Sequence, residues 1–395
     1  MRVLRLAARL DIPGCTVGSV GPAGETWATW ASTYASCRSA APPPPSGCPA
    51  AARGRTRVLA HYMLWFGEPK LVGGAATDKG HWIWETAATF NRLTAGCNNT
   101  QKVAAWFPPA PGAFASFDAA HIAADVALMK QHCVDGVVLD YQQPSKADPT
   151  RSVIDAAFPA VVAAVEKAGL EWAVMYDSSS KPNWGKNDPA VQADWQRLMA
   201  LSASSPAYVR NSQNELLLFA FGATPMPSKF TLQAASCADC AFLSQDDRTN
   251  TWPACVSAKQ RGGFAWVEHT AETAAARAAY LTGFYSSCAR SASKPACVGA
   301  AFGGFKAVYP GHGVIPRSAK TLAQTLALCG QHAEICQVVT WNDFNEGTQV
   351  APSHWCDGKG QPMQYLQAIR AFKLGQAQQA AASEASSVLQ DTALQ

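Results

Sequence analysis

The sequence predicts an α/β protein that folds as one (β/α)8 TIM barrel. Eight short apolar segments recur along residues 57–375, and segments with helical patterns lie between several of them. The apolar segments are almost continuously apolar, which is the pattern of strands buried on both faces, as in a parallel sheet. A doubly wound sheet is the alternative fold, but the glycine-rich phosphate-binding fingerprint typical of it is absent.

Eight segments have the composition of buried strands, because apolar residues fill nearly every position. They are Val58–Leu64, Val103–Phe107, Gly136–Tyr141, Trp172–Asp177, Leu216–Phe221, Gly263–Val267, Phe305–Tyr309 and Gln337–Trp341. We expect these segments to form the eight strands of the barrel in this order.

Five segments between the expected strands have helical patterns. In the first of them, Ile122, Val126 and Met129 follow the i, i+4, i+7 spacing of a single helix face. The five are Ala119–His132, Ser152–Ala168, Val191–Leu201, Ala271–Tyr280 and Ala319–Cys329. Strands that alternate with such helices predict βα units around a parallel sheet.

The regions before and after the predicted barrel in the sequence do not have the pattern of strands and helices. Residues 1–56 are expected to form an irregular N-terminal arm, and its four consecutive prolines, Pro42 to Pro45, have the composition of a semi-rigid linker. Residues 376–395 are rich in Ala, Gln and Ser and are expected to form a helical or frayed tail. The 395 residues therefore divide into this arm, a barrel over residues 57–375 and this tail.

The chain has few charges: 15% of its residues are charged, and its formal net charge is +4. Soluble domains average about 25% charged residues, and a nucleic-acid-binding protein would carry a basic stripe. We therefore expect no nucleic-acid partner. A hydrophobic fraction of 48% argues against a disordered chain, and no apolar run is long enough to predict a membrane span. We expect a monomer.

Thirteen cysteines predict several disulfides and at least one remaining thiol. Disulfides persist in oxidising compartments, so we expect a secreted protein or one in the lumen of the secretory pathway. The N-terminal sequence does not support export, because Asp11 and Pro13 interrupt the apolar stretch that a signal peptide needs. Three cysteines could join the arm to itself or to the barrel, namely Cys15, Cys37 and Cys48.

Cys237 and Cys240 form a C-x-x-C motif, which occurs in disulfides, zinc sites and redox centres. A zinc site needs a second pair of ligands at similar spacing, and none lies nearby in the sequence. We therefore interpret this pair as a structural disulfide, and we expect neither a metal nor a cofactor.

Polar and aromatic residues follow the expected strands at their carboxyl ends, where barrel enzymes carry their catalytic groups. The last strand runs directly into Trp341-Asn342-Asp343-Phe344-Asn345-Glu346-Gly347. In a straight strand Asp343 and Glu346 would point to opposite faces, but the chain must turn beyond the strand end, and Gly347 permits that turn. We expect both carboxyls in one cleft as the catalytic pair.

The surrounding residue types favour a glycosidic bond as the target. One carboxylic acid protonates the leaving oxygen and a second acts as base or nucleophile, while aromatic rings stack on the apolar faces of a neutral sugar. The candidate substrate contacts are His61, Tyr62, Trp65, Trp82, Trp106, Asp140, Tyr141, Tyr176, Asp177, Trp266, Tyr309, Trp341 and Asn342. The alternatives are an aspartate that caps the next helix and an aromatic residue that only packs the core. The expected partner is an oligo- or polysaccharide.

Five segments resemble glycoside hydrolase family 99. They are Val58–Pro69, His81–Trp82, Val174–Ser178, Ala307–Gly311 and Thr340–Ser353. The last segment, TWNDFNEGTQVAPS, is the most specific, because it is similar to the family's N-E-W-H-E-G-T-Q motif. The resemblance implies a barrel enzyme that cleaves α-mannosides within a glycan, as endo-α-mannosidases and endo-α-mannanases do, and that needs no metal.

The resemblance also implies roles for the last segment. Asp343 matches the base that helps the sugar's own 2-hydroxyl attack, a route that retains configuration, and Glu346 matches the general acid/base. Asp343, Phe344 and Asn345 depart from the family's Glu, Trp and His. The W-N-D-F-x-E form is closer to family 71, the α-1,3-glucanases, which implies an inverting pair with a water between the carboxyls. The departures also motivate a third hypothesis, a carbohydrate-binding barrel without catalysis.

Overall fold

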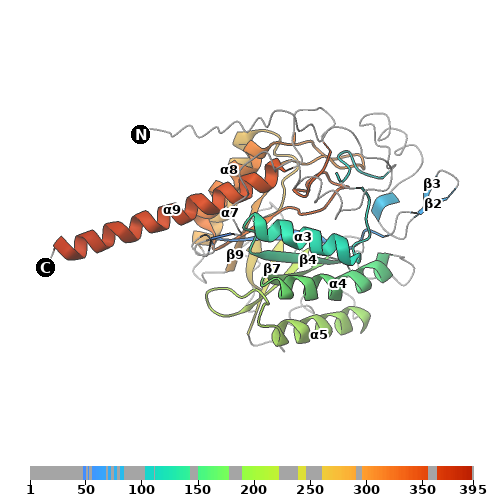
Figure 1. Ribbon diagram of the computed structural model, residues 1–395, viewed down its shortest axis with the longest axis horizontal. Helices are drawn as coiled ribbons and strands as arrows, with labels where there is room; N and C mark the ends of the chain where they lie inside the picture. Colours follow the sequence, from blue (N-terminus) through green and yellow to red (C-terminus); the bar gives the residue numbers. More distant parts are fainter. Residues whose placement is uncertain are drawn as a thin grey trace.

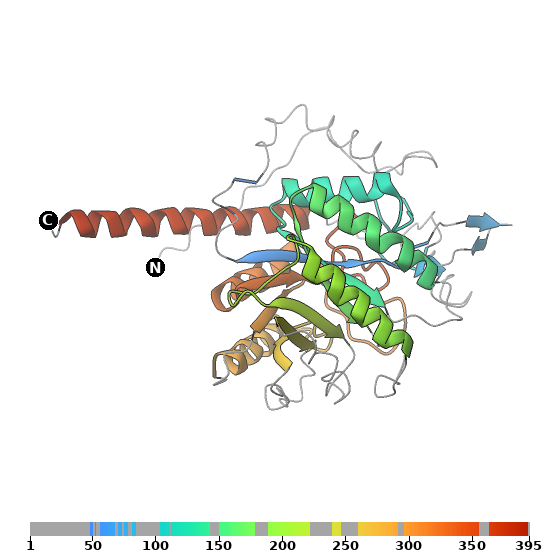
Figure 2. The same ribbon diagram turned by 90° about the horizontal axis from the view of Figure 1, so that it is seen from below.

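The computed structural model shows a closed barrel of eight parallel strands in the order β1-β10-β9-β8-β7-β6-β5-β4 (Figure 1, Figure 2). The structure describes residues 48–49, 52, 56–67, 70–72, 75–77, 81–83, 103–110, 112–142, 150–177, 189–221, 239–245, 260–290, 296–354 and 363–393. The predicted (β/α)8 fold class is confirmed.

The barrel strands are β1 Arg57–Met63, β4 Gly136–Gln142, β5 Glu171–Asp177, β6 Leu216–Phe221, β7 Cys240–Gln245, β8 Gln260–Phe264, β9 Ala296–Ala301 and β10 Ile335–Val338. The helices are α3 Ala119–Gln131, α4 Thr150–Lys167, α5 Pro189–Ser204, α7 Ala274–Arg290, α8 Ala319–His332 and α9 Gln364–Ala393. A hairpin of β2 Lys70–Val72 and β3 Ala75–Thr77 and the short helix η3 His81–Ile83 follow β1. Figure 2 shows the green helices α3, α4 and α5 covering one side of the strands.

Six of the eight predicted strands are confirmed, and two are wrong. Val103–Phe107 and Phe305–Tyr309 are irregular segments. Their apolar residues are nevertheless buried: Val103, Ala105 and Phe305 belong to the main core, and Ala104 and Val308 form a small cluster of their own. Strands β7 and β9 are not among the strands predicted from the sequence. Small residues make up β9, ACVGAA, so its hydrophobic signal is weak.

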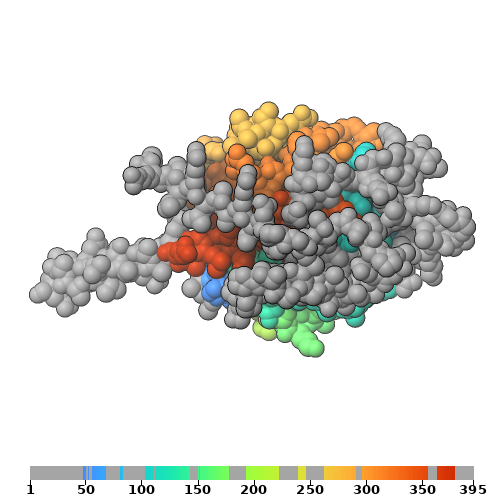
Figure 3. Space-filling view, turned by 45° about the horizontal axis from the view of Figure 1, so that its top comes forward, coloured from blue at the N-terminus to red at the C-terminus, as the bar shows by residue number. Residues whose placement is uncertain are grey.

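All five predicted helices are confirmed, and α7 begins three residues later than expected. The expected boundary between barrel and tail, at residues 375 and 376, falls inside α9. This helix packs against α8 and then extends well beyond the barrel (Figure 1, Figure 2). Its red residues lie at the molecular surface in Figure 3. Within the described residues, no helix has the length and apolar character needed to cross a membrane.

The structure contains several disulfides, as predicted. Those with both partners described are Cys48–Cys133, Cys288–Cys297 and Cys329–Cys336. The first connects the N-terminal arm to the end of α3, which is one of the two arrangements expected for Cys48. Cys240 is also disulfide-bonded, whereas Cys15, Cys37 and Cys237 lie outside the described residues.

Side chains alternate between the interior and the exterior along each barrel strand. The strand register places one interior layer at Met63, Asp140, Met175 and Phe219. The layer above it, at the carboxyl ends of the strands, contains Gln142, Asp177 and Phe221. Acidic side chains therefore enter the barrel interior where the strands end, which is the position of catalytic groups in barrel enzymes.

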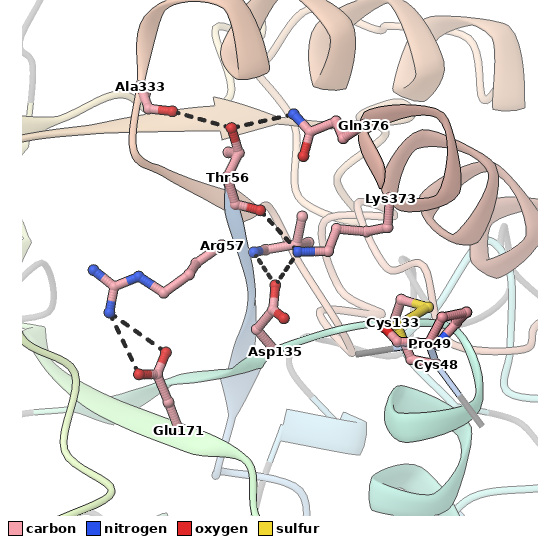
Figure 4. A network of polar contacts seen from close by, with 11 residues as sticks. Cys48, Pro49, Thr56, Arg57, Cys133, Asp135, Glu171, Ala333, Lys373 and Gln376 are labelled. Atoms are coloured by element: carbon pink, nitrogen blue, oxygen red, sulfur yellow. Dashed lines mark hydrogen bonds and ion pairs between the residues drawn. A yellow bond between two sulfur atoms is a disulfide. The ribbon is translucent and has the colours of Figure 1, made fainter. Parts of the chain in front are cut away.

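At the opposite end of the barrel, Lys373 fastens α9 to the strands (Figure 4). Its ammonium is fully buried, lies 2.7 Å from Asp135 Oδ2 and donates to the Thr56 carbonyl oxygen at 2.9 Å. The same Asp135 oxygen accepts a hydrogen bond from the backbone N–H of Val58 at 2.7 Å. Gln376 Nε2 donates to Thr56 Oγ1 at 3.2 Å. One carboxylate thus joins α9, the start of β1 and the segment before β4.

The substitution Lys373→Met is expected to lower the free energy of unfolding by about 3 kcal/mol, because it leaves the largely buried Asp135 carboxylate without its cation. Lys320→Met removes the same charge from an exposed side chain and is expected to change that energy by less than about 0.5 kcal/mol. Urea unfolding followed by circular dichroism measures both variants. Equal destabilisation of the two would contradict the structural role of this ion pair.

Candidate active site

A pocket opens at the carboxyl end of the barrel, and acidic and aromatic side chains form most of its wall. Its lining residues are Met63, Trp65, His81, Asp140, Gln142, Asp177, Phe221, Trp266, Tyr309, Asp343, Asn345 and Glu346. They come from β1, β4, β5 and β6, from η3, and from the segments that follow β1, β8, β9 and β10. No lysine or arginine is among these lining residues.

The segment after β10 turns sharply and brings Asp343 and Glu346 to the same pocket. The backbone N–H of Asp343 donates to Thr340 Oγ1 at 2.8 Å, and the backbone N–H of Glu346 donates to Asp343 Oδ1 at 3.0 Å. Gly347 ends the turn with a φ of 64°, a left-handed conformation that glycine adopts without strain. The turn expected from the sequence is therefore present.

Burial sets the protonation of this pair. It raises the pKa of Glu346 to about 7, although a hydrogen bond from the Tyr309 hydroxyl lowers that pKa. Burial also raises the pKa of Asp343 well above its ordinary value, and the negative charge of Glu346 adds to this rise. Between them, the two carboxyls therefore hold at least one proton near neutral pH. A proton held at this pH is the condition that acid/base catalysis requires.

Two further carboxyls line the same pocket. Burial and the charge of Glu346 raise the pKa of Asp140 well above its ordinary value. Asp177 lies one layer higher than Asp140, at the end of β5, and its charge raises the pKa of Glu346. Each carboxyl thus disfavours ionisation of its neighbours, so the pocket carries less negative charge than its number of acids suggests.

Aromatic rings form the apolar walls. Trp65 stacks on His81 with ring centroids 4.4 Å apart, and both line the pocket. Trp266 contacts Phe221 edge to face at 5.0 Å. Tyr309 contributes its ring as well as the hydroxyl that donates to Glu346. Indole and phenol faces next to carboxyls suit a ligand with both apolar faces and hydroxyl groups.

Three of the tyrosines proposed as substrate contacts point away from the pocket. Each is adjacent in sequence to a residue that faces the barrel interior, so alternation along the strand turns the tyrosine outward. The hydroxyl of Tyr62 donates to Asp125 at 2.9 Å, and that of Tyr141 donates to Asp155 at 3.0 Å. Tyr176 is fully buried against Trp195, with ring centroids 4.9 Å apart.

Other proposed contacts support the pocket instead of lining it. Trp82 is fully buried and donates to the Phe114 carbonyl oxygen, and Trp341 is fully buried as well. The Asn342 side chain binds both the N–H and the carbonyl group of Met63. Trp106 is partly exposed and donates from Nε1 to the Ala307 carbonyl oxygen. His61 lies in the barrel interior below the pocket and contacts Asp140.

The remaining candidates do line the pocket: Trp65, Asp140, Asp177, Trp266, Tyr309, Asp343 and Glu346. Five further residues line the pocket and are not among the predicted contacts: Met63, His81, Gln142, Phe221 and Asn345. Strand alternation could have indicated Gln142, since it lies two residues after Asp140. Asn345 could not be inferred locally, because its amide donates to the carbonyl oxygens of His81 and Ala104 from distant parts of the chain.

Among the described residues, no group of three or more His, Cys, Asp or Glu side chains is arranged to hold a metal ion.

Solved structures of known proteins share this fold. A structure of the GH99 endo-α-mannosidase from Bacteroides thetaiotaomicron with Bis-Tris propane aligns with a TM-score of 0.62 and 15% identity, over 83% of this chain and 98% of that chain. A second structure of that enzyme aligns with a TM-score of 0.61 and 15% identity, over 82% and 98%. These structures thus confirm the barrel fold that the resemblance to family 99 implies. No family model and no curated protein matches the sequence.

The raised pKa of Glu346 predicts a pH-dependent cost to stability. The folded protein holds this proton up to about pH 7, whereas an unfolded chain loses it near 4.5, so stability falls as the pH rises through that window. Glu346→Gln removes the ionisation while keeping an acceptor for Tyr309. This variant should match the wild type near pH 4 and exceed its stability at pH 8 by on the order of 2 kcal/mol.

Thermal and urea unfolding at several pH values test this expectation. The matched control is Glu272→Gln, which neutralises an exposed glutamate outside the pocket lining. Its stability relative to the wild type should change little with pH. A difference between Glu346→Gln and wild type that stays constant from pH 4 to 8 would contradict the buried ionisation of Glu346.

Proposed function

We propose that the protein is a glycoside hydrolase that acts on an α-linked neutral glycan. One observation carries the proposal: the turn after β10 places Asp343 and Glu346 in one aromatic pocket, where both have raised pKa values. A glycosidic bond needs such a pair, with one group protonated and the other able to take a proton. The absence of lysine and arginine among the lining residues favours a substrate without negative charge.

In this mechanism Glu346 is the general acid. Its pKa of about 7 keeps much of it protonated near neutral pH, and the Tyr309 hydroxyl fixes one of its oxygens. As the glycosidic bond breaks, the proton of Glu346 goes to the departing oxygen. Glu346 is then a carboxylate that can take a proton from the water that enters the site in the next step.

Asp343 is the proposed base. In the family 99 route it takes the proton of the sugar's 2-hydroxyl, whose oxygen then attacks the anomeric carbon, and the incoming water restores the original configuration. The endo-α-mannosidase activity of the solved family 99 structures makes an α-mannoside the first substrate to test. Trp65 and Trp266 would stack against sugar faces at the pocket wall.

One feature supports an inverting alternative, as in the α-1,3-glucanases. The side chain of Asp343 is a methylene shorter than glutamate, and the backbone N–H of Glu346 holds its Oδ1 at the turn. This carboxyl is therefore drawn back toward the chain, which leaves space for a water between it and the sugar. Asp343 would then activate that water, and the released sugar would have the opposite configuration.

The proposal also covers the location of the protein, its oligomeric state and its need for a cofactor. The disulfides favour an oxidising location, so we place the protein outside the cell or in the lumen of the secretory pathway. We propose that it works as a monomer and without a cofactor. The non-catalytic alternative is a barrel that binds glycans in the same pocket.

Hydrolysis of α-mannan and of α-1,3-glucan, followed by NMR, tests the function and identifies the anomer released first. Glu346→Gln and Asp343→Asn are each expected to lower the rate on the order of 10³-fold, since each loses one proton transfer. Glu272→Gln serves as the control and should keep the wild-type rate. The α-anomer as first product indicates retention, and the β-anomer indicates inversion.

Two outcomes would contradict this reading. Equal activity of Glu346→Gln and wild type would exclude the proposed role of Glu346. Glycan binding without release of reducing ends, over a broad panel of substrates, would favour the non-catalytic barrel instead.

A further inference from the structure

Asn345 lines the pocket, and hydrogen bonds fix the orientation of its side chain. Nδ2 donates one hydrogen to the His81 carbonyl oxygen at 2.9 Å and the other to the Ala104 carbonyl oxygen at 2.7 Å. The reversed amide would place its oxygen against both carbonyl oxygens, so the two amide atoms are assigned without ambiguity. Both hydrogens are thus used, and Oδ1 remains as an atom that can only accept a hydrogen bond.

Oδ1 of Asn345 is buried, and within the part of the chain that the structure describes it has no hydrogen-bond partner. The backbone carbonyl oxygen of the same residue, in contrast, accepts from the N–H of Val308 at 2.8 Å. An unpaired buried acceptor is costly in a folded protein. Beside a pocket, such an atom indicates a position where a bound molecule supplies the missing hydrogen.

Trp65, which also lines the pocket, carries the complementary group. Its indole Nε1 is buried and lacks a partner among the described residues, and an indole N–H can only donate. The ring stacks on His81 with centroids 4.4 Å apart, and the backbone N–H of His81 donates to the Trp65 carbonyl oxygen at 3.1 Å. The carbonyl oxygen of the same His81 binds Asn345. His81 therefore connects the donor and the acceptor within one stretch of the pocket wall.

Hydroxyl groups fit this donor and acceptor, because a hydroxyl both donates and accepts hydrogen bonds. A sugar unit in the pocket can give a hydroxyl hydrogen to Asn345 Oδ1 and accept the Trp65 N–H on a hydroxyl oxygen. A carboxylate or a sulfate has no hydrogen for Asn345. The C–H groups of a deoxy sugar serve neither residue. The two atoms therefore favour a neutral sugar that retains its hydroxyls.

Asn345 stands at a position where family 99 has histidine, so the side chain is a feature of this sequence. A neutral imidazole carries a single N–H, so histidine could not donate to both carbonyl oxygens. Asparagine does so with one atom and keeps an oxygen for the pocket. The bonds to His81 and Ala104 hold that oxygen in place before a ligand arrives, which lowers the cost of binding.

We propose that Asn345 and Trp65 are specificity-determining residues that bind hydroxyl groups of the sugar unit in the pocket, Asn345 as acceptor and Trp65 as donor. The proposal rests on the proposed function, because it takes the pocket to be a glycan site. It adds the substrate class, which is a neutral sugar with its hydroxyls in preference to a deoxy sugar or a uronic acid. Proton transfer stays with Asp343 and Glu346.

Binding tests these contacts without any need for hydrolysis. Methyl α-mannoside and methyl α-glucoside, each with its monodeoxy analogues, are titrated into the full-length protein and followed by NMR. The wild type should bind at least one parent glycoside. Removal of a contacted hydroxyl should weaken that binding about tenfold or more, since it leaves Asn345 Oδ1 or Trp65 Nε1 unpaired.

Trp65→Phe removes the indole N–H and keeps an aromatic ring beside His81. For the hydroxyl that accepts from Trp65, this variant should bind the parent glycoside and the deoxy analogue with affinities within about twofold of each other. Trp106→Phe is the matched control, because the Trp106 N–H already donates to the Ala307 carbonyl oxygen and the residue lies outside the pocket lining. It should keep the discrimination of the wild type.

Asn345→Leu removes the acceptor together with two bonds that hold the pocket wall, so its control must lose a similar bond. Gln349→Leu meets this need, because Gln349 is fully buried outside the pocket lining and its Nε2 donates to the Phe107 carbonyl oxygen at 2.8 Å. Both variants are expected to be less stable than the wild type, but only Asn345→Leu should lose its preference for a hydroxyl. If Asn345→Leu does not fold, Trp65→Phe still decides the proposal.

A wild type that binds neither parent glycoside, or binds every deoxy analogue as tightly as its parent, would overturn the proposal. Tighter binding of methyl α-glucuronide or of an N-acetylhexosaminide than of both parents would overturn it too, as would discrimination that survives Trp65→Phe. The expected pattern in a protein that releases no reducing ends from α-mannan or α-1,3-glucan would refute the hydrolase and support the proposal. Hydrolysis without discrimination among the analogues would do the reverse.

Discussion

Neighbouring side chains on a barrel strand point to opposite sides of the sheet, and this constraint selects the residues that form the pocket. Asp140 faces the interior, so Tyr141 must face α4 and α5, where Arg197 and Asp155 meet its hydroxyl. In the same way Asp177 faces inward and Tyr176 outward. The acids are thus gathered above a closed interior, and the aromatic walls come from segments beyond the strand ends.

Burial of several carboxyls in one place opposes stability and favours reactivity. Each acid loses hydration and faces other acids, so its pKa rises. Glu346 gains from this arrangement the protonation that an acid catalyst needs. The rest of the structure compensates, since a large apolar core surrounds the barrel. Such a conflict between local stability and activity is common at catalytic sites.

The sequence predicts those features that depend on local pattern. Six of the eight barrel strands and the turn from Asp343 to Gly347 follow from the pattern of neighbouring residues, so the sequence predicts them. The segment Phe305–Tyr309 was misjudged, because apolar residues under a loop and in a strand look alike. The hydrogen bond from Tyr309 to Glu346 and the contact of His61 with Asp140 join separate strands or loops. Only the closed barrel brings these side chains together.

The attachment of α9 has a consequence for biosynthesis. Lys373 reaches back over 317 positions in the chain to Thr56, and β1 also pairs with β10 to close the barrel. β1 can pair early with β4, but the ribosome must make all the other barrel strands before β1 can pair with β10. Contacts this distant in sequence slow folding and prolong the exposure of unpaired strand edges. The growing chain would then benefit from chaperones until α9 emerges.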